Sequence, residues 1–412
     1  MFQNNLLMAA ASISAGAYEI NYSCRFNTAD DAVLSIANGT ATSSTTATIA
    51  FWFKIGVIGV DRAFFGEEGF YTGCAFLATG QLYVVHNGAI VLTTTQVFRD
   101  PSAWYHCVCV YDTTESVDTD RFKIYINGAQ VTAYTSGTFP TEDEAFSSWN
   151  TSGATNLVAD GHSTYANYDG YLSEFHSIDG VAYGPTTFGE FDDYGVWRPI
   201  EVTGVTYGNN GFYLDFADSS ALGNDVSGND NDLTSSGLAA TDQMDDTPTK
   251  NFSTLNPNQE VWNAAVTLSD GNLHGAGSSA AVGNQITGTI AVSSGKWVFA
   301  SKPTAIEGLN GDLFVCNNAG RNDRTAHTHG AANFWAFTFS GPTSAVTYDQ
   351  TSSTSRTPSP DLAVGDYQLC ALDVDNLAIW YGIYDVSAGT TVWADNSTGW
   401  TGDPTEDRKS VV

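Results

Sequence analysis

The chain consists of short apolar or alternating runs that are separated by turn-forming residues. Such runs recur from about residue 21 onward, with Gly, Asn, Asp and Pro between them. Runs of this kind are typical of β-strands, whereas amphipathic helices repeat their apolar residues every three or four positions over longer stretches. We find no convincing long helical pattern. The sequence therefore predicts an all-β protein.

Two Asn-Gly pairs predict tight hairpins in the first half of the chain. The pair at 87–88 follows the strand-like residues 82–86, and the pair at 127–128 follows residues 122–126. Asn-Gly accepts the positive φ angles of a two-residue type I′ turn, whose twist matches the strands that it joins. Antiparallel pairing is therefore expected on both sides of each pair.

The charge balance excludes several classes of partner. Lys plus Arg number 15 against 45 Asp plus Glu, which gives a net charge of −30 over 412 residues. A field of that sign repels phosphate backbones and anionic lipid surfaces, so a nucleic-acid partner is not expected. The longest apolar stretches, 6–17 and 49–60, are shorter than the roughly 18 residues that a membrane helix needs. Membrane insertion is therefore not expected either.

Changes in composition divide the chain into four parts. They are an N-terminal arm at 1–20, a β-sandwich at 21–200, a connector rich in Asp, Asn and Gly at 201–260, and a second β-sandwich at 261–412. Many short strands without a repeat of fixed length favour sandwiches over propellers. We therefore expect two antiparallel β-sandwiches in tandem.

The cysteines and the N-terminus indicate assembly inside a cell. Six cysteines are scattered along the chain without a CxxC pair. This pattern favours buried free thiols and a reducing cytoplasm over an oxidising compartment. The first residues also lack the basic region of a secretory signal, so we expect the N-terminal arm to serve in docking.

Four segments of the first domain resemble the laminin G-like, concanavalin A-like lectin/glucanase superfamily. They are Ala50–Lys54, Ser102–Asp112, Phe122–Gly128 and Asp169–Gly180, and they occur in the family's order between about Cys24 and Phe191. The resemblance implies a jelly-roll sandwich of two antiparallel sheets. Both lectins and glycoside hydrolases have this fold, so the resemblance does not identify a ligand.

The second domain resembles a SPRY domain, a β-sandwich of related layout. Gly288–Phe299 is similar to the family's opening segment, and Val364–Gly382 is similar to its central strands. The family continues with further strands beyond a segment like Gly402–Thr405, whereas this sequence ends at Val412. The resemblance therefore implies a second sandwich that is shortened or that a partner chain completes.

The order of the parts resembles virion proteins of marine bacteriophages. The motifs Gly195–Pro199 and Asp225–Asp232 lie between the lectin-like and SPRY-like halves. The resemblance implies a fibre, spike or capsid-decoration component on the virion surface, assembled in the host cytoplasm. Its implied partners are other virion proteins, a host-surface glycan or receptor, and further copies of itself, with a trimer as a common state of viral fibres.

Catalysis requires carboxylates that the sequence does not place together. The glucanase branch of this fold carries E-x-D-x-x-E on one strand, because a period of two projects the side chains into one cleft. That motif is absent. Glu142–Glu144 is read as a solvated acidic turn, and Glu174 as an isolated structural carboxylate. We therefore expect no catalytic residues.

The acidic connector suggests a calcium site. Asp215, Asp218, Asp225 and Asp230 offer the hard oxygen ligands that calcium prefers, although their spacing differs from that of an EF-hand loop. The alternative is that these side chains form Asx turns. Calcium is the one cofactor that the sequence suggests.

A loop between residues 149 and 168 has the composition of a sugar site. Sugars bind where aromatic rings meet their apolar faces and polar side chains meet their hydroxyl groups. The candidate ligand-binding residues are Trp149, His162, Tyr165 and Tyr168. The alternative for each ring is burial in the core or contact with a neighbouring subunit.

These features together predict a virion structural protein without catalytic activity. Its role would be adhesion to a host-surface glycan or receptor, strengthened by many copies on one particle. The main rival is a purely architectural protein that decorates or cements a capsid. A polysaccharide-degrading enzyme is the third possibility.

Overall fold

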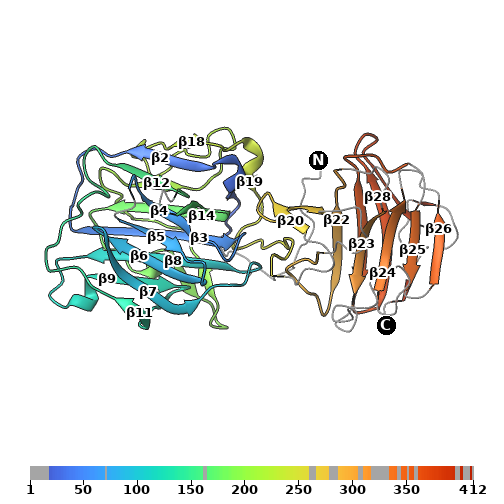
Figure 1. Ribbon diagram of the computed structural model, residues 1–412, viewed down its shortest axis with the longest axis horizontal. Coiled ribbons are helices and arrows are strands. Elements are labelled where there is room, and N and C mark those ends of the chain that lie inside the picture. The colour runs from blue at the N-terminus through green and yellow to red at the C-terminus, as the bar shows by residue number, and fades with distance from the viewer. Residues whose placement is uncertain are drawn as a thin grey trace.

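The computed structural model describes most of the chain and consists of β-strands with a few short 3-10 helices (Figure 1). The described residues are 18–69, 72–160, 165–258, 266–277, 286–304, 310–316, 334–340, 345–349, 352–356, 361–394, 400–401 and 409–410. The 3-10 helices are η1 (Thr28–Asp30), η2 (Asp118–Asp120), η3 (Pro185–Thr187) and η4 (Ala240–Asp242). The all-β prediction is confirmed. Within the described ranges, no helix has the length and apolarity to cross a membrane.

The first domain is a sandwich of two antiparallel sheets. Sheet A has the order β10-β9-β8-β3-β14-β1-β19, with β17 beside β14. Its strands are β1 (Ser23–Phe26), β3 (Thr46–Ile55), β8 (Trp104–Asp112), β9 (Phe122–Ile126), β10 (Ala129–Gln130), β14 (Gly170–Asp179), β17 (Phe212–Leu214) and β19 (Gln243–Met244).

Sheet B faces sheet A across the core. Its order is β11-β7-β6-β5-β4-β12-β2-β18, with the short β13 parallel to β4. Its strands are β2 (Val33–Ala37), β4 (Arg62–Glu67), β5 (Gly73–Phe76), β6 (Gln81–His86), β7 (Ala89–Val97), β11 (Tyr134–Gly137), β12 (Thr155–Val158), β13 (Ala166–Asn167) and β18 (Thr234–Ser236).

Both predicted Asn-Gly hairpins are present. Asn87 and Gly88 join β6 to β7, and Asn127 and Gly128 join β9 to β10. All four residues have positive φ angles between 48° and 77°, as a type I′ turn requires. Each hairpin extends the edge region of one sheet.

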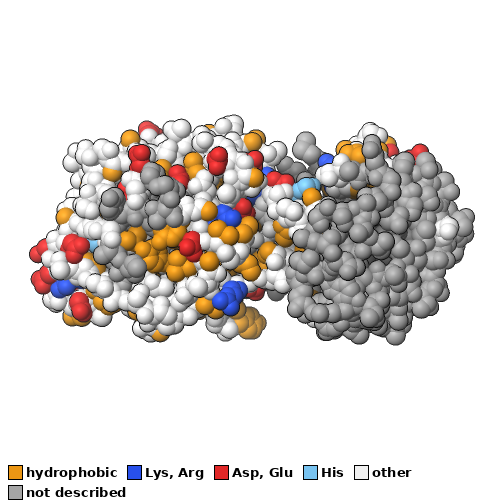
Figure 2. Space-filling view, viewed as in Figure 1, with side chains coloured by type: hydrophobic (Ala, Val, Ile, Leu, Met, Phe, Trp, Pro, Cys, Tyr) orange, Lys and Arg blue, Asp and Glu red, His pale blue; other side chains and the backbone are white. Residues whose placement is uncertain are grey.

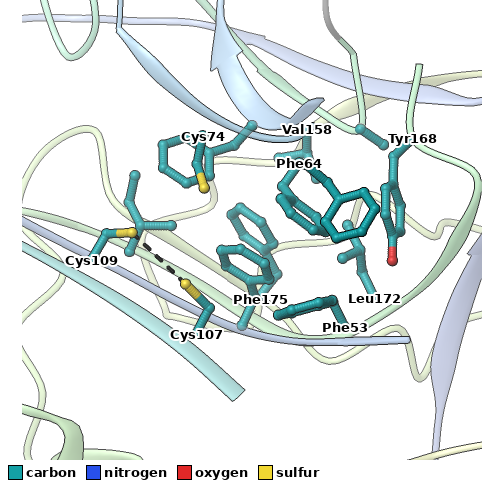
Figure 3. Packing of buried hydrophobic residues seen from close by; sticks show 14 of the residues in the cluster. Phe53, Phe64, Cys74, Cys107, Cys109, Val158, Tyr168, Leu172 and Phe175 are labelled. Carbon is teal, nitrogen blue, oxygen red and sulfur yellow. Dashed lines mark hydrogen bonds between the residues drawn. The ribbon is translucent and has the colours of Figure 1, made fainter. Parts of the chain in front are cut away.

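The core between the sheets is built largely from aromatic rings (Figure 3). Phe51 and Phe175 stack with centroids 5.3 Å apart, and Phe53 packs on Phe64 at 4.8 Å. Phe51 and Phe53 occupy alternate positions of β3, because successive strand residues point to opposite faces. Phe175 comes from the neighbouring β14 of sheet A, and Phe64 comes from β4 of the facing sheet B. The result is a continuous apolar layer.

Buried free thiols are confirmed at five positions. They are Cys24, Cys74, Cys107, Cys109 and Cys370. Cys107 and Cys109 point to the same face of β8, with their sulfur atoms 3.9 Å apart, and Cys74 lies beside them in the core (Figure 3).

The residues expected to form a connector are instead largely part of the first sandwich. β17 pairs with β14, β18 pairs with β2, and β19 pairs with β1. Strand edges carry unpaired N–H and C=O groups, and these short segments supply partners for them. The boundary between the domains therefore lies later than residue 200.

The second domain contains two described sheets beside the first domain (Figure 1). One sheet has the order β22-β27-β28-β29-β30, with β31 beside β28, and the other has the order β23-β24-β25-β26. The strands are β22 (Lys296–Ser301), β23 (Asn310–Cys316), β24 (Phe334–Ser340), β25 (Ala345–Asp349), β26 (Ser352–Arg356), β27 (Tyr367–Asp373), β28 (Ala378–Asp385), β29 (Thr390–Ala394), β30 (Trp400–Thr401) and β31 (Lys409–Ser410).

Two small hairpins complete the described elements. β15 (Gly189–Phe191) pairs with β16 (Trp197–Pro199), and β20 (Val266–Ser269) pairs with β21 (His274–Gly277). Trp197 of β16 packs in an apolar cluster with Trp52 and Trp104, on the outer face of sheet A. That face of the sheet is consequently buried as well.

Candidate functional site

A polar hollow of about 300 Å³ lies where β2 ends. Residues 36–40 form one wall, and Asn209, Asn210 and Asn231 form the other. Asn38 is the fourth asparagine among the lining residues, and no charged residue lines the hollow. We call this site the amide hollow.

Asp179 holds the loops of the amide hollow together. It ends β14 and is buried, with 2% of its surface exposed. Its carboxylate accepts hydrogen bonds from the backbone N–H groups of Thr42 (2.7 Å), Ser43 (3.1 Å) and Asn210 (3.2 Å). It also accepts one from the Nδ2 of Asn150 at 2.8 Å. One carboxylate thereby fixes three separate segments.

Asp225 organises the opposite wall in the same way. It accepts the backbone N–H groups of Tyr213 (2.8 Å), Ser227 (2.9 Å) and Asn231 (2.9 Å). The Ser227 hydroxyl donates to it as well, at 2.8 Å. The acidic motif at 225–232 therefore shapes a loop, and the oxygen atoms of its first carboxylate, Asp225, are occupied by donors.

The structure favours Asx turns over calcium at the four predicted aspartates. Asp215 and Asp218 each accept the backbone N–H of the residue two positions later, and Asp225 is saturated as described above. Asp230 lies exposed at a positive φ of 57°. Among the described residues, no three His, Cys, Asp or Glu side chains gather in a way that could hold a metal ion. The geometry at these four aspartates therefore supports the turn alternative.

We expect neither calcium nor a chelator to change the thermal stability of the protein. A bound ion would raise the unfolding midpoint, because ligands that bind only the native state stabilise it. Scanning calorimetry with millimolar calcium, and separately with EDTA, should give midpoints within about 2 °C of each other. A rise of more than that with calcium would contradict the turn assignment.

The amide hollow presents hydrogen-bond acceptors. The Nδ2 of Asn209 donates to the Thr40 carbonyl at 3.2 Å, and the Nδ2 of Asn231 donates to the Asn209 and Gly211 carbonyls at 2.9 Å. The side-chain oxygens of both asparagines accept no hydrogen bond from the described residues. The Oδ1 of Asn38 is buried and also lacks a donor there. A ligand that donates through hydroxyl groups would supply hydrogen bonds to the side-chain oxygens of Asn209 and Asn231.

Two of the predicted sugar-binding aromatics belong to the core instead. Trp149 is 3% exposed and packs against Phe146 and Tyr111, at centroid distances of 5.1 and 6.3 Å. Tyr168 is 1% exposed, and its hydroxyl donates to the Lys54 carbonyl at 2.7 Å. Neither ring has a face free for a ligand. The core alternative is therefore correct for both residues.

Tyr165 keeps part of its ring at the surface, and His162 lies outside the described residues. The Tyr165 ring is 5.8 Å from Tyr83 of β6, and both rings pack on a small apolar cluster of sheet B. The buried members of that cluster are Ala63, Ala75 and Val85. Figure 2 shows hydrophobic side chains gathered over β5 and β6 on this face of the molecule. Burial raises the pKa of Tyr165, so its phenol remains a neutral donor.

The Glu142–Glu144 segment is an acidic turn, as the sequence indicated. Glu142 is exposed and lies 3.4 Å from Arg121. Glu144 accepts the backbone N–H and the hydroxyl of Thr141 at 2.8 and 3.0 Å. These contacts fold the turn back on itself.

Glu174 is more unusual than its isolated position in the sequence suggests. It has a φ of +48° at an irregularity of β14, a region that non-glycine residues seldom occupy. Its carboxylate accepts the hydroxyls of Tyr213 (2.7 Å) and Tyr18 (3.2 Å). Burial raises the pKa of this carboxyl group to about 7, against the lowering effect of the two hydroxyls.

Comparisons with known proteins agree with the fold of the first domain. Residues 27–181 match the model of the concanavalin A-like lectin/glucanases superfamily. This part of the chain therefore has the concanavalin A-like, laminin G-like fold. No curated protein is significantly similar to the chain.

Three solved structures are similar to parts of the chain at low sequence identity. A Bacteroides ovatus protein to which carbohydrate binding is ascribed has 16% identity and a TM-score of 0.37 over 53% of this chain and 58% of its own length. The SAP-like pentraxin of Limulus polyphemus has 12% identity and a TM-score of 0.33 over 54% of this chain and 98% of its own. Domains LG4-5 of the mouse laminin α1 chain have 8% identity and a TM-score of 0.31 over 100% and 84%.

Sequence reasoning missed the asparagines of the amide hollow. The available signals were the adjacent amides at 209–210 and the Asn-Gly pair at 38–39, both of which are typical of turns. Nothing in their spacing indicates that they meet. Residues 38 and 210 come together because both segments pack against the end of β14, where Asp179 binds them.

Proposed function

We propose that the protein binds a neutral, hydroxyl-rich glycan through the amide hollow and does not catalyse a reaction on it. The observation that carries this proposal is the pair of amide oxygens of Asn209 and Asn231, which accept no hydrogen bond from the described residues, in a hollow without charged walls. Neutral acceptors match sugar hydroxyls, whereas an anionic ligand would find few donors there. The lectin-like class of the first domain supports the same conclusion.

The absence of a carboxylate in the hollow supports binding without catalysis. Glycoside hydrolysis needs two carboxyl groups on opposite sides of the scissile bond. Asp179 and Asp225 lie behind the walls, and their oxygens are occupied by N–H donors. Neither is free to transfer a proton to a sugar.

We further propose that this binding serves attachment of a bacteriophage particle to its host. The support is the resemblance of the domain order and of the motifs at 195–199 and 225–232 to phage virion proteins. Other virion proteins and further copies of the chain would then be its partners, and weak individual contacts would add up over many copies. The rival is a capsid-decoration protein that binds no host ligand.

A glycan array together with binding to intact host cells tests the proposal. The wild-type protein should bind a neutral glycan. Thr40→Trp should weaken that binding by at least about tenfold, because Thr40 is an exposed residue of the hollow wall and a tryptophan there would fill the space. Thr119→Trp is the matched control, since Thr119 is an exposed threonine of η2 that does not line the hollow.

Two results would count against glycan binding through the hollow. One is a folded wild-type protein that binds neither glycans nor cells, which would favour capsid decoration. The other is binding that Thr40→Trp leaves unchanged, which would place the ligand elsewhere, with the Tyr83 and Tyr165 surface as the next site to mutate.

A further inference from the structure

A lysine is fully buried on the outer face of sheet A. Lys54 lies near the end of β3, and its side chain has 0% exposure. Its Nζ donates to the Oδ2 of Asp246 at 2.7 Å, to the Oδ1 of Asn251 at 2.9 Å and to the carbonyl of Phe252 at 2.6 Å. An amine, a carboxyl group and a primary amide therefore meet in one enclosed place.

The surroundings of these three groups are apolar and aromatic. Trp104 and Tyr171 belong to the apolar cluster on this face, and the Tyr171 ring centroid lies 5.9 Å from the Lys54 Nζ. The Asp246 carboxylate also accepts the Nε1 of Trp104 at 2.9 Å, which fixes its orientation. Desolvation lowers the pKa of Lys54, although Asp246 opposes this effect.

We propose that Lys54 and Asn251 join in an intramolecular isopeptide bond, with Asp246 as the proton carrier. The Lys54 Nζ transfers a proton to Asp246 and becomes a neutral amine. Its lone pair then attacks the Asn251 Cγ, and a bond forms between Nζ and Cγ. The Cγ–Nδ2 bond breaks as Asp246 passes a proton to Nδ2 and takes one from Nζ. One amide and one ammonia result, without an oxidant or cofactor.

The position of Asn251 suits this reaction. Its Nδ2 donates to the Ser102 carbonyl at 2.7 Å, so the amide is held with its Oδ1 toward Lys54. Holding the reacting groups in contact replaces a bimolecular encounter by an intramolecular step. Asn251 is only half-buried, which gives the departing ammonia a path to solvent.

A second group of an amine, an amide and a carboxylate lies nearby and can be compared with the first. Lys250 donates to the Oδ1 of Asn21 at 3.3 Å and lies 3.5 Å from a carboxylate oxygen of Glu19. Lys250 and Glu19 are well exposed, with side-chain exposures of 38% and 43%. Water therefore solvates that amine, which is not enclosed against its amide as Lys54 is. We expect no bond between Lys250 and Asn21.

The bond would tie the two domains more firmly. It connects β3 to a residue 197 positions later, at the beginning of the segment that leads to the second domain. A pulling force on the second domain would then be passed directly to β3 through this bond, in addition to the path along the main chain. This property is independent of glycan binding.

Peptide mass spectrometry of the full-length protein tests the proposal. Trypsin should leave Lys54 uncleaved and yield residues 26–62 joined to residues 251–296, lighter by one ammonia than the two peptides together. Intact mass alone is insufficient, because a succinimide at an Asn-Gly pair also loses ammonia. Fragmentation of the joined peptide distinguishes the two products, since a succinimide joins nothing.

Variants assign the roles. Asn251→Ala and Asp246→Asn should each abolish the joined peptide, whereas Lys250→Arg, which keeps the tryptic site but removes the amine, should leave it in place. If Asp246→Asn does not fold, Asn251→Ala still tests the reaction, because Lys54 keeps its contacts with Asp246 and Phe252. Cleavage at Lys54 together with a free peptide 251–296 in the folded wild-type protein would overturn the proposal.

Discussion

Replacement of Asp179 by alanine should lower the free energy of unfolding by about 3–5 kcal/mol and disrupt the amide hollow. The carboxylate is buried and accepts the backbone N–H groups of Thr42, Ser43 and Asn210. Alanine would leave these groups without an acceptor in a place that water reaches poorly, and each such group costs about 1–3 kcal/mol. The loops at 38–45 and 207–211 would then separate from the end of β14.

Urea denaturation followed by tryptophan fluorescence measures this effect. Asp179→Asn should fall between wild type and Asp179→Ala, because one amide oxygen can still accept two of the bonds. Asp192→Ala is the matched control, since Asp192 caps an exposed turn through the N–H groups of Tyr194 and Val196. It should leave the unfolding midpoint almost unchanged. Equal midpoints for Asp179→Ala and wild type would refute the proposed role of this carboxylate.

Replacement of Glu174 by glutamine should stabilise the protein at pH 8 by up to about 3 kcal/mol. The pKa of this carboxyl group is raised from 4.5 to about 7 in the folded protein by burial. At pH 8 the wild-type protein must therefore keep an ionised carboxylate in a site that favours the neutral form. Glutamine is neutral at every pH and can still accept the hydroxyls of Tyr18 and Tyr213.

The stability difference between Glu174→Gln and the wild-type protein should depend on pH. Between pH 4.5 and about 7 the folded protein holds a proton on Glu174 that the unfolded chain has lost, so the stability contributed by this group falls as pH rises. Below pH 4.5 both states are protonated, and the advantage of Glu174→Gln should disappear. Thermal unfolding at pH 4.5, 6 and 8 measures it, with the exposed Glu190→Gln as control. A constant difference across this range would contradict the assignment.

Much of the fold could be predicted because its signals are local. The strand runs and the two Asn-Gly turns depend on residues within a few positions of one another, and the landmarks from Ala50 to Gly180 follow one order along the chain. The structure differs from the connector expected at 201–260, because strand pairing between distant residues gives no local signal. The polar composition of this segment is that of a loop, but β17, β18 and β19 are edge strands whose pairing depends on distant partners.

The candidate sites could not be predicted in the same way. Trp149 and Tyr165 share a loop-like sequence context, yet one ring is in the core and the other is partly exposed. The sequence shows which residue types are present, but burial depends on what the rest of the chain places above each ring.

The sequence by itself determined the strand content, the turn types, the acidic surface and the class of the first domain, because each follows from composition or from short-range pattern. Only the tertiary structure decided which polar groups meet. Asp179 became the centre of the amide hollow, and Lys54 came to face Asp246 and Asn251, because strand pairing brings together residues that are more than 100 positions apart. Contacts at that separation leave no periodic signal in a single sequence.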